Sequence, residues 1–203
     1  LINAGEGGSL ITDDPELAAR AVIMSGAYEH NWKKHPGLQN SFHHWQNKLP
    51  LYNTRMQNLS AAVIRPQIAE VPRRVADGRA NHDYVAEILN TSPWLDVPPP
   101  LAPETRAPDS LQFNLVGEWS DAEALRLQDE AKARGVGVQV FGLSKDNARA
   151  YWNWQFLGDI PELPKTRAML MRACDTRLPA RLKKPDLDFI AHAIVEAATA
   201  VKG

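Results

Sequence analysis

The residues best suited to chemistry near the start of the chain form a glycine-rich turn around one acid: Gly5, Glu6, Gly7 and Gly8. Glycine takes positive φ at no steric cost, so this backbone can approach another group closely. Residues 9–12 then predict a strand. The two aspartates and the proline at 13–15 predict a helix start, because acids and proline favour the first helical turn.

A second candidate for binding is the segment 51–56, LYNTRM, which contains Asn53 and Arg55. The Arg55 guanidinium can bind a substrate carboxylate or phosphate in a fork. A surface ion pair explains the same arginine equally well, and an isolated asparagine is more often a cap or turn residue. This segment therefore needs a second signal before either residue can be given a role.

Four histidines fall within residues 27–56, at His30, His35, His43 and His44. Zinc sites combine closely spaced ligands with carboxylate or thiolate partners, and the chain has a single cysteine. We therefore predict no metal site. The segment has no clean periodicity, and a long polar loop of this kind usually serves function or contacts a partner. We interpret it as a loop at a subunit interface.

A dense aromatic run follows Arg149 and consists of Tyr151, Trp152, Trp154 and Phe156. These rings could wall the mouth of a substrate site, where tryptophan offers flat area and an N–H donor. Core packing beneath a small sheet is an equally good interpretation. Binding to nucleic acid is excluded, because no basic patch accompanies the rings.

The composition is that of an ordinary globular protein. The 203 residues are 44% hydrophobic and 23% charged, with a net charge of -1, so neither nucleic acid nor a membrane surface is an expected partner. The single cysteine, Cys174, cannot form an internal disulfide and favours a cytoplasmic location. No apolar run approaches the roughly 20 residues of a membrane span.

The first half of the chain predicts mainly helices. Apolar spacing indicates a helix over 16–25, and helical pieces over 59–65, 67–71 and on to residue 89, separated by Pro66 and Pro72. Prolines crowd residues 91–109, which therefore form an extended linker.

The second half predicts a small α/β unit. Alternating apolar residues indicate strands over 111–115 and 136–140, and Ser120 with Glu123 makes a capping box for the helix between them. Helices over 164–174 and 185–201 follow.

Together, the glycine turn and the LYNTRM segment resemble the DegT and StrS family of sugar aminotransferases, which have fold type I and use pyridoxal phosphate (PLP). That family has a lysine, then four residues, then GEGG. Leu1 to Ala4 fill this gap, so the resemblance puts the catalytic lysine immediately before Leu1, and we expect the chain to be the second segment of a longer protein divided there. The family also has a second motif, matched here by Asn53, Arg55, Met56, Ala61, Ala62, Gln67, Ile68 and Arg79.

The resemblance implies a set of domains and site residues. Residues 1–56 would end the PLP-binding large domain and include the interface loop, 57–90 would be connecting helices, 91–109 the linker and 110–203 the small α/β domain. Asn53 would bind the phosphate of the partner subunit's PLP in a homodimer with shared active sites. Arg55, Trp152 and Arg177 are the candidate substrate residues, with Arg177 for the α-carboxylate of an amino donor or, alternatively, a surface arginine.

The expected activity is the transfer of an amino group from glutamate or glutamine to a ketone or aldehyde, for which a sugar or cyclitol is the family expectation. The chain departs from the family at Leu111–Gln112 and over 141–157, where histidines facing a nucleotide sugar are usual. This departure puts the acceptor in doubt more than the reaction. A PLP-dependent sugar dehydratase, or a non-catalytic helical interaction module, remains the alternative.

Overall fold

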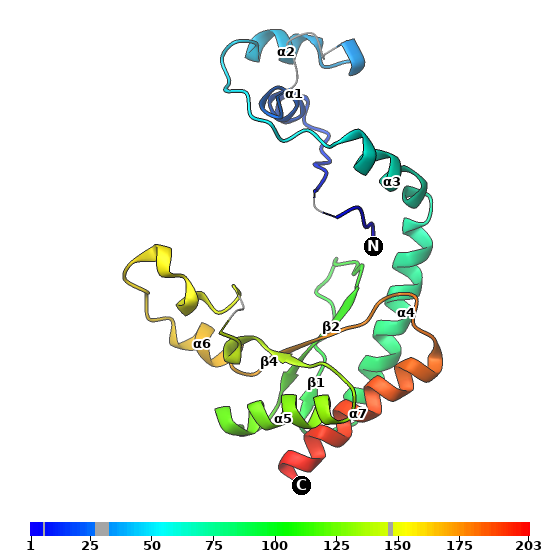
Figure 1. The fold of residues 1–203 in the computed structure, drawn as a ribbon, viewed down its shortest axis with the longest axis vertical. Coiled ribbons are helices and arrows are strands. Elements are labelled where there is room, and N and C mark those ends of the chain that lie inside the picture. Colours follow the sequence, from blue (N-terminus) through cyan, green and yellow to red (C-terminus); the bar gives the residue numbers. More distant parts are fainter. Residues whose placement is uncertain (6, 27–32, 146–147) are drawn as a thin grey trace. The chain divides into compact units, whose positions relative to one another are not determined.

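The computed structural model describes residues 1–5, 7–26, 33–145 and 148–203. Glu6 of the glycine turn and His30 lie outside the described residues. The chain divides into two compact units, Ile2–Glu70 and Val71–Gly203, the second of which also includes Leu1 (Figure 1). We call them the motif unit and the sheet unit. Residues 91–109 lie wholly within the sheet unit, and the four-part domain division stays a prediction.

The motif unit contains three helices: α1 (Pro15–Met24), α2 (Gln39–Trp45) and α3 (Asn58–Ile68). The predicted start of α1 is confirmed, because the Asp14 side chain accepts a hydrogen bond from the Glu16 amide at 2.9 Å. Ala19, Ile23 and Phe42 form its small buried core.

Two predictions for this unit are wrong. Residues 27–56 are not loop throughout, because α2 lies within them. The Glu16 carboxylate holds α2 by accepting hydrogen bonds from Ser41 Oγ and Trp45 Nε1, both at 2.5 Å. Residues 9–12 are extended but form no strand, since no described residue supplies a pairing ladder and Ile11 is 94% exposed.

The sequence predicts two or three helical pieces divided at Pro66 and Pro72. The structure has two, but neither proline is the point of division. Pro66 lies in the last turn of α3, where the loss of one backbone donor does not end the helix. The helix α4 (Val71–Leu89) begins one residue before Pro72, a position at which the missing N–H has no helical partner to lose.

The sheet unit is built on four strands, β1 (Leu95–Asp96), β2 (Ser110–Leu115), β3 (Gln139–Val140) and β4 (Ala173–Arg177). Their order is β1-β2-β4-β3, and each neighbouring pair is antiparallel. The strands β2 and β3 are therefore parallel, and α5 connects them. Because β4 lies between them in the sheet, the three elements form a split β-α-β unit. The predicted α/β class is confirmed.

The central strand β4 was not predicted. Residues 164–174 were assigned to one helix, but α6 (Pro164–Leu170) ends earlier and Cys174 is buried in the sheet. Buried and less buried residues alternate over only five positions of β4, and one of its two buried residues, Thr176, is polar. The local apolar pattern is therefore weak, and the strand is specified by its pairing with β2 on one side and β3 on the other. The strand β3 is also shorter than predicted.

Helices cover one face of this sheet (Figure 1). The helices α4, α5 (Asp121–Ala133) and α7 (Lys184–Lys202) share one buried core with Leu111, Phe113 and Val140 of the strands. The capping box of α5 is confirmed. On the opposite face, Gln112, Asp175 and Gln139 lie side by side in register across β2, β4 and β3. The sheet therefore has one apolar and one polar face.

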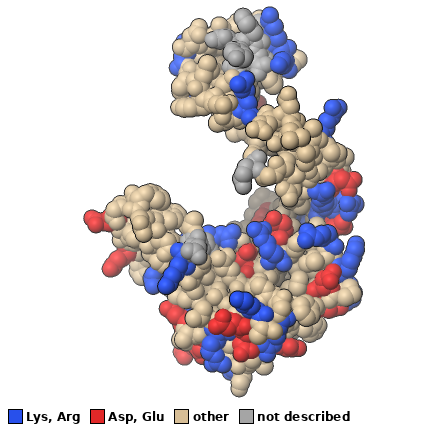
Figure 2. All heavy atoms as spheres, viewed as in Figure 1, with Lys and Arg blue, Asp and Glu red and all other residues tan. Residues whose placement is uncertain are grey.

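The surface carries both signs of charge. Figure 2 shows lysines and arginines interspersed with aspartates and glutamates over the sheet unit on the visible face. None of the helices in the described ranges is long and apolar enough to cross a membrane. The same residues contain no cluster of three histidine, cysteine or acidic side chains that could hold a metal ion.

Candidate functional site

The two motifs of the sequence meet in a pocket of the motif unit. The pocket has a volume of about 400 Å³ and is lined by Ala4, Gly7, Gly8, Thr54, Arg55, Met56, Gln57 and Ser60. The glycine turn supplies one side and the LYNTRM segment with the start of α3 supplies the other. Residues separated by about fifty positions in the sequence are thus brought together around one hollow.

The glycine turn takes a backbone path that other residues rarely adopt. Gly5 has φ +81° and Gly7 has φ +138°, so both positions favour glycine even though the space around them is open. The prediction that this turn uses positive φ is confirmed.

The turn is attached to α3 by the amide of Gln67. Gln67 Nε2 donates to the Asn3 carbonyl at 2.8 Å, and the Asn3 amide donates to Gln67 Oε1 at 3.0 Å. Gln67 Nε2 also lies 2.9 Å from the carbonyl of Val63 in its own helix. This reciprocal pair fixes the backbone immediately before the turn. The sequence placed Gln67 in a family pattern, but its partner could be found only from the fold.

The segment that carries Asn53 is attached to the end of α1. The Tyr52 amide donates to the Met24 carbonyl at 2.9 Å, and the Thr54 amide donates to the Ser25 carbonyl at 3.1 Å. Gly26 makes this approach possible, because a Cβ there would lie 2.1 Å from the Tyr52 carbonyl oxygen. Asn53 therefore sits between two anchored residues, and it is exposed.

Arg177 and Arg149 line a second pocket, in the sheet unit. This pocket has a volume of about 590 Å³, and Gln139 and Asp175 also contribute to its wall. Arg177 ends β4, is 79% exposed and has its Nη1 atom 3.7 Å from Asp109 Oδ2. Its ion pair is weak because both partners are solvated.

The aromatic run lies outside the buried core of the sheet unit. Phe156 is 79% exposed and stacks on Trp154 with ring centroids 5.7 Å apart. Trp152 carries the Arg167 guanidinium 4.5 Å from its ring centroid. The interpretation of the run as core packing is therefore wrong, and its role at a substrate mouth stays a prediction. Trp152 does not line the Arg177 pocket.

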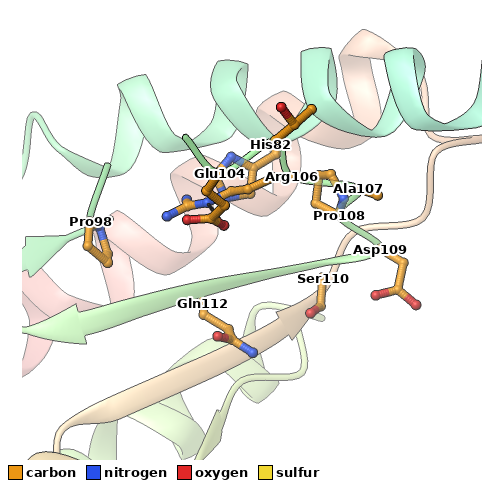
Figure 3. A pocket seen from close by; sticks show the side chains of 10 residues that line it. His82, Pro98, Glu104, Arg106, Ala107, Pro108, Asp109, Ser110 and Gln112 are labelled. Carbon is orange, nitrogen blue, oxygen red and sulfur yellow. Dashed lines mark hydrogen bonds and ion pairs between the residues drawn. The ribbon is translucent and has the colours of Figure 1, made fainter. Parts of the chain in front are cut away.

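A third hollow, of about 410 Å³, borders the position where the family pattern has a histidine. Figure 3 shows His82 of α4 on one side of β2 and Gln112 pointing away on the other. Glu104 and Arg106 form an ion pair at 3.1 Å within this hollow, and a hydrogen bond from the Leu101 amide lowers the pKa of Glu104. His82 is only 6% exposed, so it does not replace the missing family histidine.

The fold of the chain is that of known PLP-dependent enzymes. It matches the aminotransferase TlmJ from Streptoalloteichus hindustanus with a TM-score of 0.66 and 20% identity, over 94% of this chain and 47% of that one. It matches DesV from S. venezuelae, solved in complex with a ketimine intermediate, with a TM-score of 0.69 and 18% identity, over 93% and 46%. The GDP-4-keto-6-deoxy-D-mannose-3-dehydratase of E. coli, with bound hydrated PLP, matches with a TM-score of 0.67 and 14% identity, over 91% and 49%.

The sequence identifies the family directly. The model of the DegT/DnrJ/EryC1/StrS aminotransferase family matches residues 1–195, and the chain belongs to that family, whose members depend on PLP. No curated protein matches the chain in a sequence search. The chain spans about half the length of the solved structures that it resembles.

Proposed function

We propose that this chain is part of a PLP-dependent aminotransferase. The enzyme moves an amino group from glutamate or glutamine to a ketone or aldehyde. The observation that supports it most strongly is the pocket in which the glycine turn meets the LYNTRM segment. Both motifs belong to the family pattern, and each is held in place by its own backbone hydrogen bonds. A sugar or cyclitol is the proposed acceptor, because the family resemblance implies both and the name of the E. coli dehydratase contains a keto sugar.

The residues of this pocket fit the phosphate end of PLP. Thr54 and Ser60 bring hydroxyls, and Gly7 and Gly8 bring a backbone without side chains to obstruct approach, while Arg55 in the same wall is the proposed substrate residue. These are groups that proteins commonly use to bind phosphate oxygens. PLP, when bound, supplies an electron sink for the amino transfer.

The proposed roles of the chain's own residues are binding and orientation. The glycine turn and Gln67 would position the cofactor lysine, which we place immediately before Leu1. Asn53 would donate its amide to the phosphate of the PLP held by a second subunit, which makes a homodimer with shared active sites part of the proposal. Arg55, Trp152 and Arg177 would contact the substrate.

A sugar dehydratase of the same superfamily is the second candidate function, because the E. coli dehydratase has a matching fold. Histidine in place of the cofactor lysine would favour it. A non-catalytic helical interaction module is the third candidate, and it predicts a colourless protein without affinity for PLP.

Single-turnover measurements on the intact protein test these candidates. An aminotransferase should retain PLP, absorb near ~420 nm, lose that absorbance with one equivalent of glutamate or glutamine, and recover it with a suitable member of a ketone panel. Retention of PLP with loss of water from a sugar, and without amino transfer, would instead identify a dehydratase. A colourless protein after dialysis against PLP would contradict both enzymatic functions.

A further inference from the structure

Asp175 has an unsatisfied carboxylate oxygen in the middle of the polar face of the sheet. Its Oδ1 atom is buried and accepts no hydrogen bond from any part of the chain that the structure describes. Asp175 lies opposite Gln112 on β2 and opposite Gln139 on β3. A buried acceptor without a donor is costly, so the carboxylate of Asp175, which lines the pocket, is suited to receive a hydrogen bond from a ligand.

Two arginines lie around the same pocket. Arg177 follows Asp175 on the same face of β4, because alternate residues of a strand share a face. Arg149 comes from the loop after β3, and its guanidinium lies 4.3 Å from the centroid of the Phe141 ring, which orients it. With two guanidinium groups and one carboxylate in the wall, an anionic ligand is favoured over a cation.

The pocket is large enough for a small metabolite. Its volume of about 590 Å³ lies within the range of about 300 to 1,000 Å³ typical of small-molecule sites. A bound molecule must satisfy two different demands here, an anionic group for the arginines and a hydrogen-bond donor for Asp175. Sulfate or a simple ionised dicarboxylate meets only the first demand, because neither carries an O–H donor near neutral pH.

We propose that the pocket lined by Asp175, Arg149 and Arg177 binds a hydroxylated anion, with its carboxylate or phosphate on the arginines and its hydroxyl donating to the Asp175 carboxylate. This inference rests on the proposed function in one respect, since it assigns the ligand to the substrate of the aminotransferase. A hydroxy acid and a sugar phosphate are two sources of the same chemistry.

Calorimetric titration of the intact PLP-loaded protein, with matched pairs of ligands, tests the proposal without turnover. L-malate is compared with succinate, and glucose 6-phosphate with sulfate, because the members of each pair have similar charge near neutral pH but only the first carries a hydroxyl. In at least one pair, the hydroxylated member should bind about tenfold more tightly, the size expected of a hydrogen bond to a charged group. The pair that shows the preference identifies the source.

Variants test separately the binding of the anionic group by the arginines and the binding of the hydroxyl by Asp175. Arg177→Gln and Arg149→Gln should each weaken both members of the preferred pair by about tenfold or more, because each removes a charged donor. Asp175→Ala should reduce the ratio of the two affinities in the preferred pair to about one, so that the hydroxyl no longer matters, and Asp175→Asn should reduce this ratio partly. Arg126→Gln and Asp129→Asn, at exposed positions of α5 on the helical side of the sheet, are the matched controls and should change neither quantity.

A preference for the hydroxyl that survives Asp175→Ala would overturn the proposal, as would the absence of binding by all four ligands. Circular dichroism of each variant shows whether it is folded, and Asp175→Asn provides the test if Asp175→Ala is not. Retention of PLP is recorded separately. Its loss in the unsubstituted protein would contradict the proposed function, whereas the hydroxyl preference can be measured with or without cofactor.

Discussion

The two units of the chain differ in how they are stabilised. The sheet unit has a continuous buried core in which strands β1 to β4 and helices α4, α5 and α7 take part. Among the residues of the motif unit that the structure describes, the buried hydrophobic cluster consists of Ala19, Ile23 and Phe42, and α3 has no buried residue. Several of its large apolar side chains are more than half exposed: Leu10, Ile11, Leu51, Tyr52, Leu59 and Ile68.

This difference shows that the two family motifs, the glycine turn and the LYNTRM segment, lie in the less well packed of the two units. In the motif unit, the side-chain amide of Gln67 holds the backbone before the glycine turn, and the amides of Tyr52 and Thr54, on either side of Asn53, donate to carbonyls at the end of α1. The exposed apolar side chains of the motif unit are suited to burial against further protein. In the proposed function, that protein is the remainder of the large domain and the second subunit.

The largest expected effect is a loss of stability confined to one unit. Phe113→Ala should lower the free energy of unfolding of the sheet unit by about 3–5 kcal/mol, because Phe113 is only 1% exposed within the continuous core. Phe42→Ala, also at a 1% exposed position, should open the motif unit and leave the sheet unit unchanged. The measurement is the protection of backbone amides against hydrogen exchange, followed in both units. Equal loss of protection in both units from either variant would show that they are not independent.

A smaller, local effect is expected at the attachment of the glycine turn. Gln67→Leu removes two hydrogen bonds to Asn3, together worth roughly 1–3 kcal/mol of local stability. Exchange of the Asn3 amide should therefore become at least about fivefold faster, while amides of the sheet unit should not change. Gln39→Leu, at the exposed start of α2 and outside the pocket of the glycine turn, is the control. Unchanged exchange at Asn3 would mean that the reciprocal pair does not hold the turn.

The smallest effect concerns the pH dependence of the sheet unit. The hydrogen bond from Lys202, followed by those from Ser120, lowers the pKa of Glu123 from its ordinary 4.5 to about 2. Because the folded pKa is the lower one, the contribution of Glu123 to stability is complete above pH 4.5 and is lost as the pH falls through about 2. The stability difference between the unsubstituted protein and Glu123→Gln should shrink over this window. A constant difference for Glu123→Gln over this window would refute the assignment.

Local chemistry allowed several elements to be predicted from the sequence. The Asp14 cap of α1, the capping box of α5, the alternation of β2 and the apolar stripe of α7 each depend on neighbouring residues. The positive φ of Gly5 and Gly7 follows from residue type in the same way. In each case the interacting residues lie within about one or two helical turns or strand repeats of one another.

Elements that depend on distant partners were missed. The strand β4 exists because it pairs with strands on both sides, and α2 is held by hydrogen bonds to Glu16 in another helix. Gln67 and Gly26 also gain their structural roles from residues far along the chain. Likewise, the buried oxygen of Asp175 becomes visible only when three strands are assembled. No local pattern contains this information.

The central claim is that Asn53, anchored beside α1, helps to bind the phosphate of PLP across a dimer. The most direct test is retention of PLP by Asn53→Ala during dialysis of the intact protein, compared with Asn58→Ala at the exposed start of α3. The account predicts that Asn53→Ala releases PLP with a dissociation constant about ten to a hundred times larger, as expected for loss of a hydrogen bond to a charged group, and that Asn58→Ala retains it. Equal retention by Asn53→Ala and the unsubstituted protein would contradict the claim.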